Sequence, residues 1–397
     1  MSERVLRLAS RGDGVTESGR HVPMAAPGDL LLPDGSVEAG PHRAVPPCRH
    51  FPECGGCQLQ HVDDQAYGEF LKDRIASAMA AQGLAVPDIL DPHISPPMSR
   101  RRASLHAERR GKQVLLGFKA ERSHQVIDMR ECFILRPELF ALVAPLRALM
   151  GELLGTRGSG GVRMTLADRG LDVLLDKVSA EGLEASEALT AFAQRHRLAR
   201  LSIDDGCGPQ TRWEPEPVTV TLGGAAVPLP HGAFLQATAE GEAALVAAAR
   251  EAVGGASIIA DLFAGLGTFA LSLHGRVLAA EGARDAAVAL KSAANRAQRQ
   301  VFVDHRDLFR RPYDEKELSR FEAVVLDPPR AGAKEQAVPL ARSEVPRIAF
   351  VSCNPATFAR DAKTLTEGGY RLDWVKPVGQ FRWSTHVELV GAFVKRL

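Results

Sequence analysis

The stretch Asp261-Leu-Phe-Ala-Gly265-Leu-Gly267 decides the fold of this chain. It comes at the end of a β-forming run, residues 257–263, and an apolar stretch follows it, which predicts a strand, a tight turn and a helix. Glycine at 265 and 267 lets the backbone approach a ligand closely, because no Cβ stands in the way. Ala270 occupies the position of a third glycine in the dinucleotide fingerprint, so a pyrophosphate ligand fits poorly.

The alternation of strands and helices continues from about Gln236 to the end of the chain. We expect strands at 276–280, 321–326, 347–352 and 387–394, and a helix at 283–298. This rhythm predicts a parallel, doubly wound α/β sheet, whose ligands bind beyond the carboxyl ends of the strands. Glu281 ends the second strand, where an acid can accept hydrogen bonds from both ribose hydroxyls of a nucleoside. We therefore predict a C-terminal Rossmann-like domain over residues 236–397.

Three further strands of this domain carry unusual chemical groups. Asp327 follows one strand and is held at the rim by two prolines, which cannot continue a ladder. Cys353 follows another, beside the expected start of a helix, whose dipole favours a thiolate. Glu388 lies inside an apolar strand, where desolvation raises the pKa of a carboxyl toward that of a useful base. The plainer interpretations are a small buried cysteine and a salt-bridged glutamate, but the set as a whole predicts an active site.

The first half of the chain has a different pattern. Residues 1–47 contain short β-like pieces separated by glycine- and proline-rich turns, and the stretch is too short for a full five-stranded barrel. Residues 63–83 have the spacing of a helix, and strands are expected at 103–107, 114–118 and 126–129. Residues 137–235 read as a further α/β segment without a chemical motif. We predict a short β segment at 1–47 and a central α+β domain at 48–235.

Composition excludes several classes of protein. The chain has 397 residues, of which 45% are hydrophobic and 24% charged, and its formal net charge is +1. It can bury a core, so wholesale disorder is excluded, and no run reaches the ~18 apolar residues of a membrane span. No signal peptide is recognisable, so we expect a cytoplasmic protein with reduced thiols. Between residues 97 and 136, ten Lys and Arg face four acids, which suggests either an RNA-phosphate surface or a solvated hairpin.

Three cysteines within ten residues predict a metal site. Cys48, Cys54 and Cys57 have the spacing C-x5-C-x2-C, and Cys132 is available as a fourth ligand. Such a set can hold either zinc or a [4Fe–4S] cluster, and the spacing alone leaves both open; with zinc, His61 is a possible substitute ligand. Cys207 matches no motif and is expected to be structural.

These motifs together resemble one family, the S-adenosylmethionine-dependent RNA 5-methyluridine methyltransferases, and in particular the iron–sulfur branch that modifies ribosomal RNA. The resemblance extends from Cys48 to Glu388 and covers the cysteine motif, Phe-Leu-Gln236, the glycine loop, Asp327-Pro-Pro-Arg, Ser-Cys353-Asn-Pro and His-Val-Glu388. It implies a [4Fe–4S] cluster on Cys48, Cys54, Cys57 and Cys132. Residues 1–47 resemble a shortened TRAM or OB-type barrel.

The resemblance also assigns roles in the C-terminal domain. Cys353 matches the nucleophile and Glu388 the base, and the ligand-contacting positions are Gln236, Phe263, Thr268, Glu281, Asp307 and Asp327. The family often has Asn where this chain has Thr268. The expected cofactors are S-adenosylmethionine and the cluster, with zinc as the alternative to the cluster. The expected partner is RNA, with neither a membrane nor an obligate protein partner implied.

The chemistry of uracil explains why such residues occur together. C5 of uracil is a poor nucleophile until a thiolate adds at C6, and a base must then remove the C5 proton. We therefore expect methylation of uridine at C5 in RNA, with 23S rRNA as the target. Alternatives are the same reaction on tRNA, a non-catalytic RNA-binding protein with a metal staple, and an N-methyltransferase that uses Asp-Pro-Pro and needs no cysteine.

Overall fold

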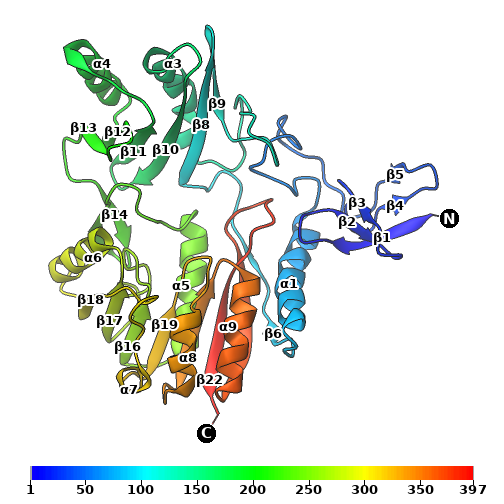
Figure 1. The fold of residues 1–397 in the computed structure, drawn as a ribbon. Coiled ribbons are helices and arrows are strands. Elements are labelled where there is room, and N and C mark those ends of the chain that lie inside the picture. The colour runs from blue at the N-terminus through cyan, green and yellow to red at the C-terminus, as the bar shows by residue number, and fades with distance from the viewer. Residues whose placement is uncertain (1, 397) are drawn as a thin grey trace.

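A computed structural model describes residues 2–396 and shows three β-sheets of five or more strands (Figure 1). The largest has the strand order β18-β17-β16-β19-β20-β22-β21-β6, with β7 also paired to β21. Its bounds are β6 Asp88–Ile89, β7 His93–Ile94, β16 Ile258–Leu262, β17 Arg276–Glu281, β18 Val301–His305, β19 Ala323–Leu326, β20 Arg347–Ser352, β21 Tyr370–Gly379 and β22 Glu388–Lys395. The strands from β18 to β20 are parallel, whereas β22 runs antiparallel to both β20 and β21.

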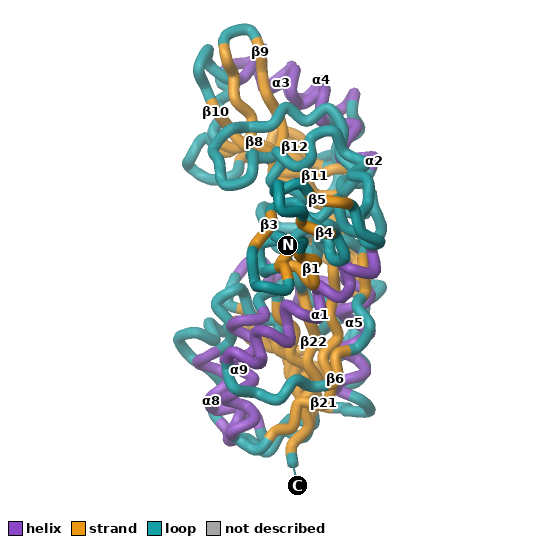
Figure 2. The backbone as a smooth tube through the Cα atoms, turned by 90° about the vertical axis from the view of Figure 1, so that its right-hand side faces the viewer, coloured by secondary structure: helices purple, strands orange, loops and turns teal. Residues whose placement is uncertain are grey.

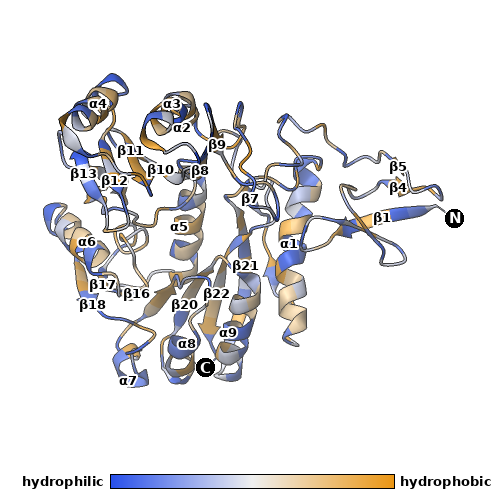
Figure 3. Ribbon diagram, turned by 45° about the horizontal axis from the view of Figure 1, so that its top comes forward, coloured by the Kyte–Doolittle hydropathy of each residue, from blue (hydrophilic) through white to orange (hydrophobic). Residues whose placement is uncertain are grey.

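Helices cover both faces of this sheet. The helices of the first face are α5 (Ala239–Val253) and α6 (Arg284–Arg296), and those of the second face are α1 (Asp64–Ala81), α8 (Lys334–Arg342) and α9 (Pro355–Glu367). Leu245 and Leu290 are fully buried in the first core, and Tyr67 and Phe358 in the second. The strands between these layers carry much of the orange, hydrophobic colour in Figure 3. The predicted doubly wound α/β class is confirmed.

The glycine loop departs from its prediction in one respect. The apolar residues after Gly267 form successive turns rather than a helix, with single bonds from Leu271 N to Gly267 O and from Leu273 N to Phe269 O. The segment is too short for a longer helix, because β17 begins at Arg276. Gly267 has a φ of +94°, and an added Cβ would lie 2.3 Å from Leu290 Cδ1, so the turn requires glycine on both counts.

The second sheet has the order β13-β12-β11-β10-β8-β9 and lies at the other end of the molecule (Figures 1 and 2). Its bounds are β8 Arg102–Arg110, β9 Gln113–Gly117, β10 Ser159–Ala167, β11 Gly170–Asp176, β12 Arg200–Asp204 and β13 Gln210–Trp213. The remaining helices are α2 Pro137–Ala141, α3 Val143–Leu153, α4 Gly182–Arg195 and the short α7 Glu315–Leu318, and a hairpin consists of β14 Thr219–Leu222 and β15 Ala225–Pro228. The expected strand at 126–129 is an extended segment with a single bridge between Val126 and Lys119.

The N-terminal segment forms a five-stranded sheet of short strands in the order β3-β2-β1-β4-β5. Their bounds are β1 Glu3–Leu8, β2 Gly14–Thr16, β3 His21–Val22, β4 Leu30–Leu31 and β5 Val37–Glu38. Arg43 pairs with the buried Asp29, whose carboxylate also accepts the N–H of Ala26 and so holds the turn before β4. This sheet agrees with the short β segment expected from the sequence.

Part of the first half of the chain joins the C-terminal sheet. The short strands β6 and β7 pair in parallel with β21, and α1 packs against α9 and β21. The predicted division at residue 236 stays a prediction, but residues 64–94 contribute directly to the layer that carries the C-terminal motifs. No helix within residues 2–396 is long and apolar enough to span a bilayer.

Candidate active site

A cavity of about 840 Å³ opens at the rim where β16, β19 and β20 end. It brings together all eight residues that the sequence assigned to ligand contact or catalysis in this domain: Gln236, Phe263, Thr268, Glu281, Asp307, Asp327, Cys353 and Glu388. Glu388 reaches the rim differently from the others. It begins β22, and because β22 is antiparallel, its start lies beside the end of β20.

The glycine loop forms one wall of this cavity. The carboxylate of Glu281 accepts the N–H of Gly265 at 2.7 Å and the N–H of Ala283 at 2.6 Å, which fixes the end of β17 against the loop. Phe263 has a φ of +65°, an uncommon value for a side chain of this size, and its ring lies 5.4 Å from that of Phe309. Asp307 accepts the N–H of Phe309 and shapes the neighbouring turn. An acid, two aromatic rings and exposed backbone are suited to a nucleoside.

Asp261 supports the loop from beneath, a role that the sequence did not specify. It is fully buried and accepts the N–H of Ala270 at 2.8 Å through Oδ2, while its Oδ1 has no partner in the part of the chain that the structure describes. Burial, with a smaller contribution from Glu281, raises the pKa of Asp261 to about 7. The sequence signal for this role was the acid at the start of the glycine-loop motif.

The cavity floor holds a thiol and two carboxyls that affect one another. Burial raises the pKa of Glu388 to about 7, against the effects of Gln380, Arg102 and Arg330. Burial and the carboxyls of Glu388 and Asp261 raise the pKa of Asp327 well above its usual range. These groups share a site of low polarity in which protons are held more tightly than in water.

Cys353 stands at a helix start, as the sequence predicts. Asn354 caps α9 by accepting the N–H of Ala356, with Pro355 in the first turn. Burial, followed by the carboxyls of Glu388 and Asp327, nevertheless raises the pKa of Cys353 to about 11, and Arg330 offsets only part of this. The thiolate therefore stays a prediction, because burial and the neighbouring carboxyls oppose the effect of the helix dipole.

Residues outside the strand ends, two of them from the central region, complete the site. Gln236 is buried and its Oε1 accepts Gln380 Nε2 at 2.7 Å, while Gln380 Oε1 accepts the N–H of Ala237 at 2.8 Å. The guanidinium of Arg102 lies 4.5 Å from the ring centre of Phe234, and both line the cavity. Arg102 belongs to the basic stretch that the sequence singled out, but its place at this rim could not be predicted. Gln380 was not singled out, because it stands in no motif and only the fold brings it to the site.

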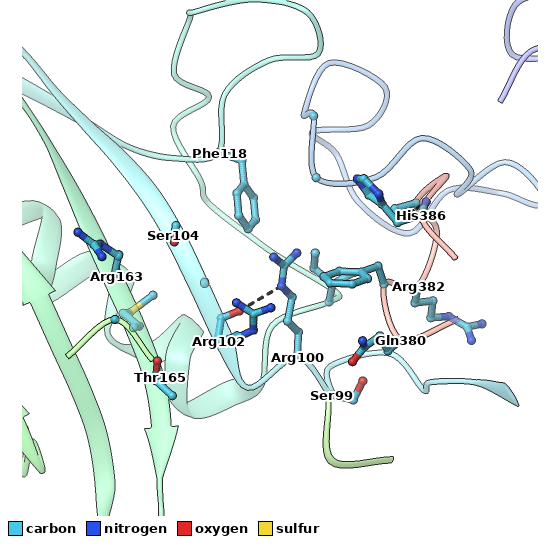
Figure 4. A pocket seen from close by; sticks show the side chains of 18 of the residues that line it. Ser99, Arg100, Arg102, Ser104, Phe118, Arg163, Thr165, Gln380, Arg382 and His386 are labelled. Atoms are coloured by element: carbon cyan, nitrogen blue, oxygen red, sulfur yellow. Dashed lines mark hydrogen bonds between the residues drawn. The ribbon is translucent and has the colours of Figure 1, made fainter. Parts of the chain in front are cut away.

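A second cavity of about 660 Å³ adjoins the first and faces β8 and β10 (Figure 4). Arg100 donates from Nε to the carbonyl of Arg102 at 3.1 Å, and its guanidinium lies 5.7 Å from the ring centre of Phe118 and 5.4 Å from that of Phe381. The two cavities share several residues, namely Arg102, Pro230, His231, Gly232, Ala233, Arg330, Phe381 and His386. A polar groove with cationic and aromatic walls therefore leads to the thiol.

The basic surface expected at 97–136 is mostly neutralised within the fold. The guanidinium groups pair internally, Arg101 with Glu242 at 2.5 Å, Arg110 with Glu108 at 2.8 Å, Arg130 with Asp128 at 2.5 Å and Arg136 with Glu138 at 3.1 Å. Arg109 donates to the carbonyls of Gly151 and Leu154. Arg100 and Arg102 line the groove. The choice between the two expectations for residues 97–136, an RNA-phosphate surface or a solvated hairpin, stays a prediction.

The four cysteines of the expected metal site line one small, largely apolar cavity, together with His50, Phe118 and Glu131. Burial raises the pKa of Cys57 to about 12 and that of Cys132 to about 11, and the neighbouring thiols add to both shifts. Backbone N–H groups of His50, Gly56 and Ile134 point at sulfur atoms. Within residues 2–396, however, no three His, Cys, Asp or Glu side chains are placed closely enough to hold a single metal ion. His61 is outside this cavity and stacks on Phe51.

The chain matches known proteins over most of its length. The model of the tRNA (Uracil-5-)-methyltransferase family matches residues 228–397. A Zymomonas mobilis protein named an uncharacterized RNA methyltransferase is 55% identical over 395 residues, 99% of this chain and 100% of that protein. The 23S rRNA (uracil(1939)-C(5))-methyltransferase RlmD of Chromohalobacter salexigens is 34% identical over 368 residues, 89% of this chain and 76% of that protein.

A solved structure has the same fold. The tRNA (uracil-54, C5)-methyltransferase of Pyrococcus abyssi, in complex with S-adenosyl-L-homocysteine, aligns with a TM-score of 0.73 over 99% of this chain and 100% of that one, at 22% identity. At this identity the match shows a shared class I methyltransferase fold. Together with the relatives that cover the whole chain, it leads to one conclusion: the chain belongs to the RNA methyltransferases of the tRNA (uracil-5-)-methyltransferase family.

Proposed function

We propose that this enzyme methylates C5 of a uridine in 23S rRNA, with S-adenosylmethionine as the methyl donor. The observation that carries the proposal is the single cavity that contains the glycine loop, Cys353, Asp327 and Glu388. A nucleoside-type wall and a thiol–carboxyl floor within one space are what C5 methylation requires, because methyl donor and uracil must meet there. The 34% identical relative named as a 23S rRNA enzyme favours rRNA over tRNA.

The nucleoside wall fits the methyl donor. Glu281, already oriented by two backbone N–H groups, has acceptor capacity left for ribose hydroxyls, and Phe263 and Phe309 offer ring faces to an adenine. The donor supplies a methyl group on a cationic sulfonium. Cys353, Asp327 and Glu388 lie on the same cavity, and a positive charge there opposes the carboxyls that hold the thiol proton.

Cys353 acts first in the proposed reaction. The thiol gives its proton to water, and the thiolate sulfur bonds to C6 of uracil. The electrons of the C5–C6 double bond then move toward O4, which makes C5 nucleophilic. After C5 has taken the methyl group, Glu388 accepts the C5 proton. The C–H electrons then re-form the C5–C6 double bond, and the sulfur leaves as a thiolate. The base must be ionised yet of high pKa, which the burial of Glu388 provides.

The cysteine cavity is proposed to hold a [4Fe–4S] cluster on Cys48, Cys54, Cys57 and Cys132. The donor set fits, because it consists of four soft thiols with backbone N–H groups directed at sulfur. Zinc on the same thiols is the alternative, and within residues 2–396 no three ligands are grouped closely enough to decide between the two. The proposal therefore rests on the donor atoms. When bound, the cluster would crosslink the four cysteines.

Substrate choice is the first prediction. Purified enzyme with labelled methyl donor should place 5-methyluridine in 23S rRNA transcripts and leave tRNA transcripts unlabelled, because the cysteine motif resembles that of the ribosomal branch and a 34% identical relative is named a 23S rRNA enzyme. Mass spectrometry of nuclease fragments locates the modified base. Labelling of tRNA alone would show that tRNA, and not 23S rRNA, is the substrate. Labelling of neither RNA would contradict the proposed activity.

The second prediction separates nucleophile from base. Cys353→Ala should abolish methylation and every covalent complex, since no other group activates C5. Glu388→Gln should still add and methylate but be unable to release the base, so a methyl-labelled protein–RNA adduct should survive denaturing electrophoresis. Wild-type enzyme with 5-fluorouridine RNA serves as the positive control, because fluorine cannot leave as a cation. If Glu388→Gln turns over normally, Glu388 is not the base and has only a structural role.

The third prediction concerns pH. Adduct decay in the wild type should accelerate as pH rises through about 7, because Glu388 must be deprotonated to act and burial raises its pKa to about 7. Quenched-flow measurement of decay from pH 6 to 8 tests this.

The same shift has a consequence for stability. A free glutamate titrates near 4.3, so the stability that protonated Glu388 contributes is complete below that pH and is lost as pH rises through about 7. Thermal melts across the same pH range therefore control for unfolding. A decay rate that does not change between pH 6 and 8 would contradict the assignment of Glu388 as base.

The fourth prediction concerns the cluster. Anaerobically purified protein should be brown, with broad absorbance near roughly 400 nm and about four irons per chain. Cys132→Ala should lose iron and colour, whereas Cys207→Ala should keep both, because Cys207 is exposed and outside the cavity. Stoichiometric zinc without a visible band would overturn the cluster.

A further inference from the structure

The loop between β21 and β22, residues 380–387, controls where the proposed base stands. It places Phe381 and His386 on both cavities and leads directly into Glu388. At its other end, Gln380 contacts Gln236 and Ala237. Any displacement of this loop therefore moves the base relative to Cys353, which stands on a different strand.

Tyr67 holds this loop from the second face of the sheet. It lies in α1, is fully buried and stacks on Phe70 with ring centres 6.4 Å apart. Its hydroxyl is 3.2 Å from the carbonyl oxygens of both Phe381 and Ser384 and shares its one proton between them. Because Tyr67 is fully buried, loss of its hydroxyl would remove a donor from both carbonyls.

Ser384 passes the contact on toward Glu388. Its carbonyl oxygen accepts Tyr67, and its Oγ accepts the N–H of His386 at 3.2 Å, two residues before the base. Ser384 itself is 5% exposed, and the hydrogen bond from His386 to it is partly buried.

The segment after Cys57 grips the same loop from another direction. The N–H groups of Gln58 and Leu59 both donate to the carbonyl of Trp383, at 2.7 and 2.8 Å. Trp383 has a φ of +59°, a strained value for a bulky residue, which surrounding contacts must hold in place. Two independent clamps, Tyr67 and the 58–59 backbone, therefore hold the tip of a loop that carries no regular structure of its own.

We propose that Tyr67 is a positioning residue for Glu388, acting through the β21–β22 loop on the removal of the C5 proton. The inference rests on the proposed function, because it needs Glu388 to be the base. Tyr67 lines neither cavity, so it can affect the reaction only by holding the β21–β22 loop in position. Small misplacement of a reacting group can cost up to ~100-fold in rate, and the loss of one loop contact should cost less than that.

The test compares two buried tyrosines. Tyr67→Phe removes only the hydroxyl that holds the loop. Tyr370→Phe makes the same change at a residue that is also fully buried, whose hydroxyl donates to the Val345 carbonyl at 2.7 Å at the opposite rim of the sheet. Both variants lose a buried hydrogen bond, so both should melt at a somewhat lower temperature than the wild type.

The variants should differ in the chemistry. In single turnovers with RNA and labelled donor, Tyr67→Phe should transfer the methyl group within about twofold of the wild-type rate but release the base about tenfold more slowly, so that labelled adduct accumulates. Tyr370→Phe should show wild-type adduct levels. Affinity for S-adenosylhomocysteine, measured by calorimetry, should be unchanged in both.

The outcomes separate the two proposals. If wild-type enzyme forms no adduct with 5-fluorouridine RNA, the proposed function itself fails. If it does, and Tyr67→Phe behaves like Tyr370→Phe, only the positioning role is overturned. Should Tyr67→Phe fail to fold, Ser384→Ala removes the hydroxyl that accepts His386 N and tests the same link. Accumulated adduct in that variant supports the proposal, and wild-type decay refutes it.

Discussion

Removal of Glu388, Asp327 and Cys353 from water at one rim is the constraint on which the site depends. Desolvating an ionised carboxyl costs several kcal/mol unless it is paired or protonated, and here no cation fully compensates the group. Burial therefore raises the pKa of Glu388 to about 7 and that of Cys353 to about 11. A cationic ligand in the cavity would oppose both shifts.

The sheet topology makes this arrangement possible. Parallel strands bring Asp327 and Cys353 to the rim by ending there, whereas Glu388 arrives at the start of the antiparallel β22. Glu388 is thus followed by a hydrogen-bonded strand, β22, and only the loop before Glu388 is irregular. That loop needs external support, which comes from α1, from the segment after Cys57 and from Gln236.

Much of the C-terminal domain could be predicted from the sequence, because its signals are local. The glycine loop, Asp327-Pro-Pro and Ser-Cys353-Asn-Pro each mark the end of a strand, and the parallel rhythm implies that such ends share one rim. The doubly wound class and the convergence of the eight residues follow from that geometry. The turn after Gly267 was misjudged as a helix, since apolar composition does not reveal how soon β17 begins.

What the sequence could not supply are properties that depend on distant partners. The charge of Arg101 looks available until Glu242, which is distant in the sequence, is brought beside it by folding. The helix start at Cys353 favours a thiolate until folding buries the thiol and places Glu388, 35 positions away in the chain, nearby. Arg102 and Gln380 carry no motif at all. In each case the missing information is a long-range neighbour, and it changes electrostatics more than it changes the fold.

The cysteine segment is connected to the loop before Glu388. Cys57 is followed at once by the two N–H groups that hold Trp383, and Cys57 and Trp383 belong to the same hydrophobic core. If the proposed centre crosslinks Cys48, Cys54, Cys57 and Cys132, it would fix the backbone around residues 57–59 and, through Trp383, residues 380–387. Such a centre would act on the proposed reaction only by holding this loop in place. Residues from the first half of the chain thus contact the 380–387 loop and also line the groove beside it.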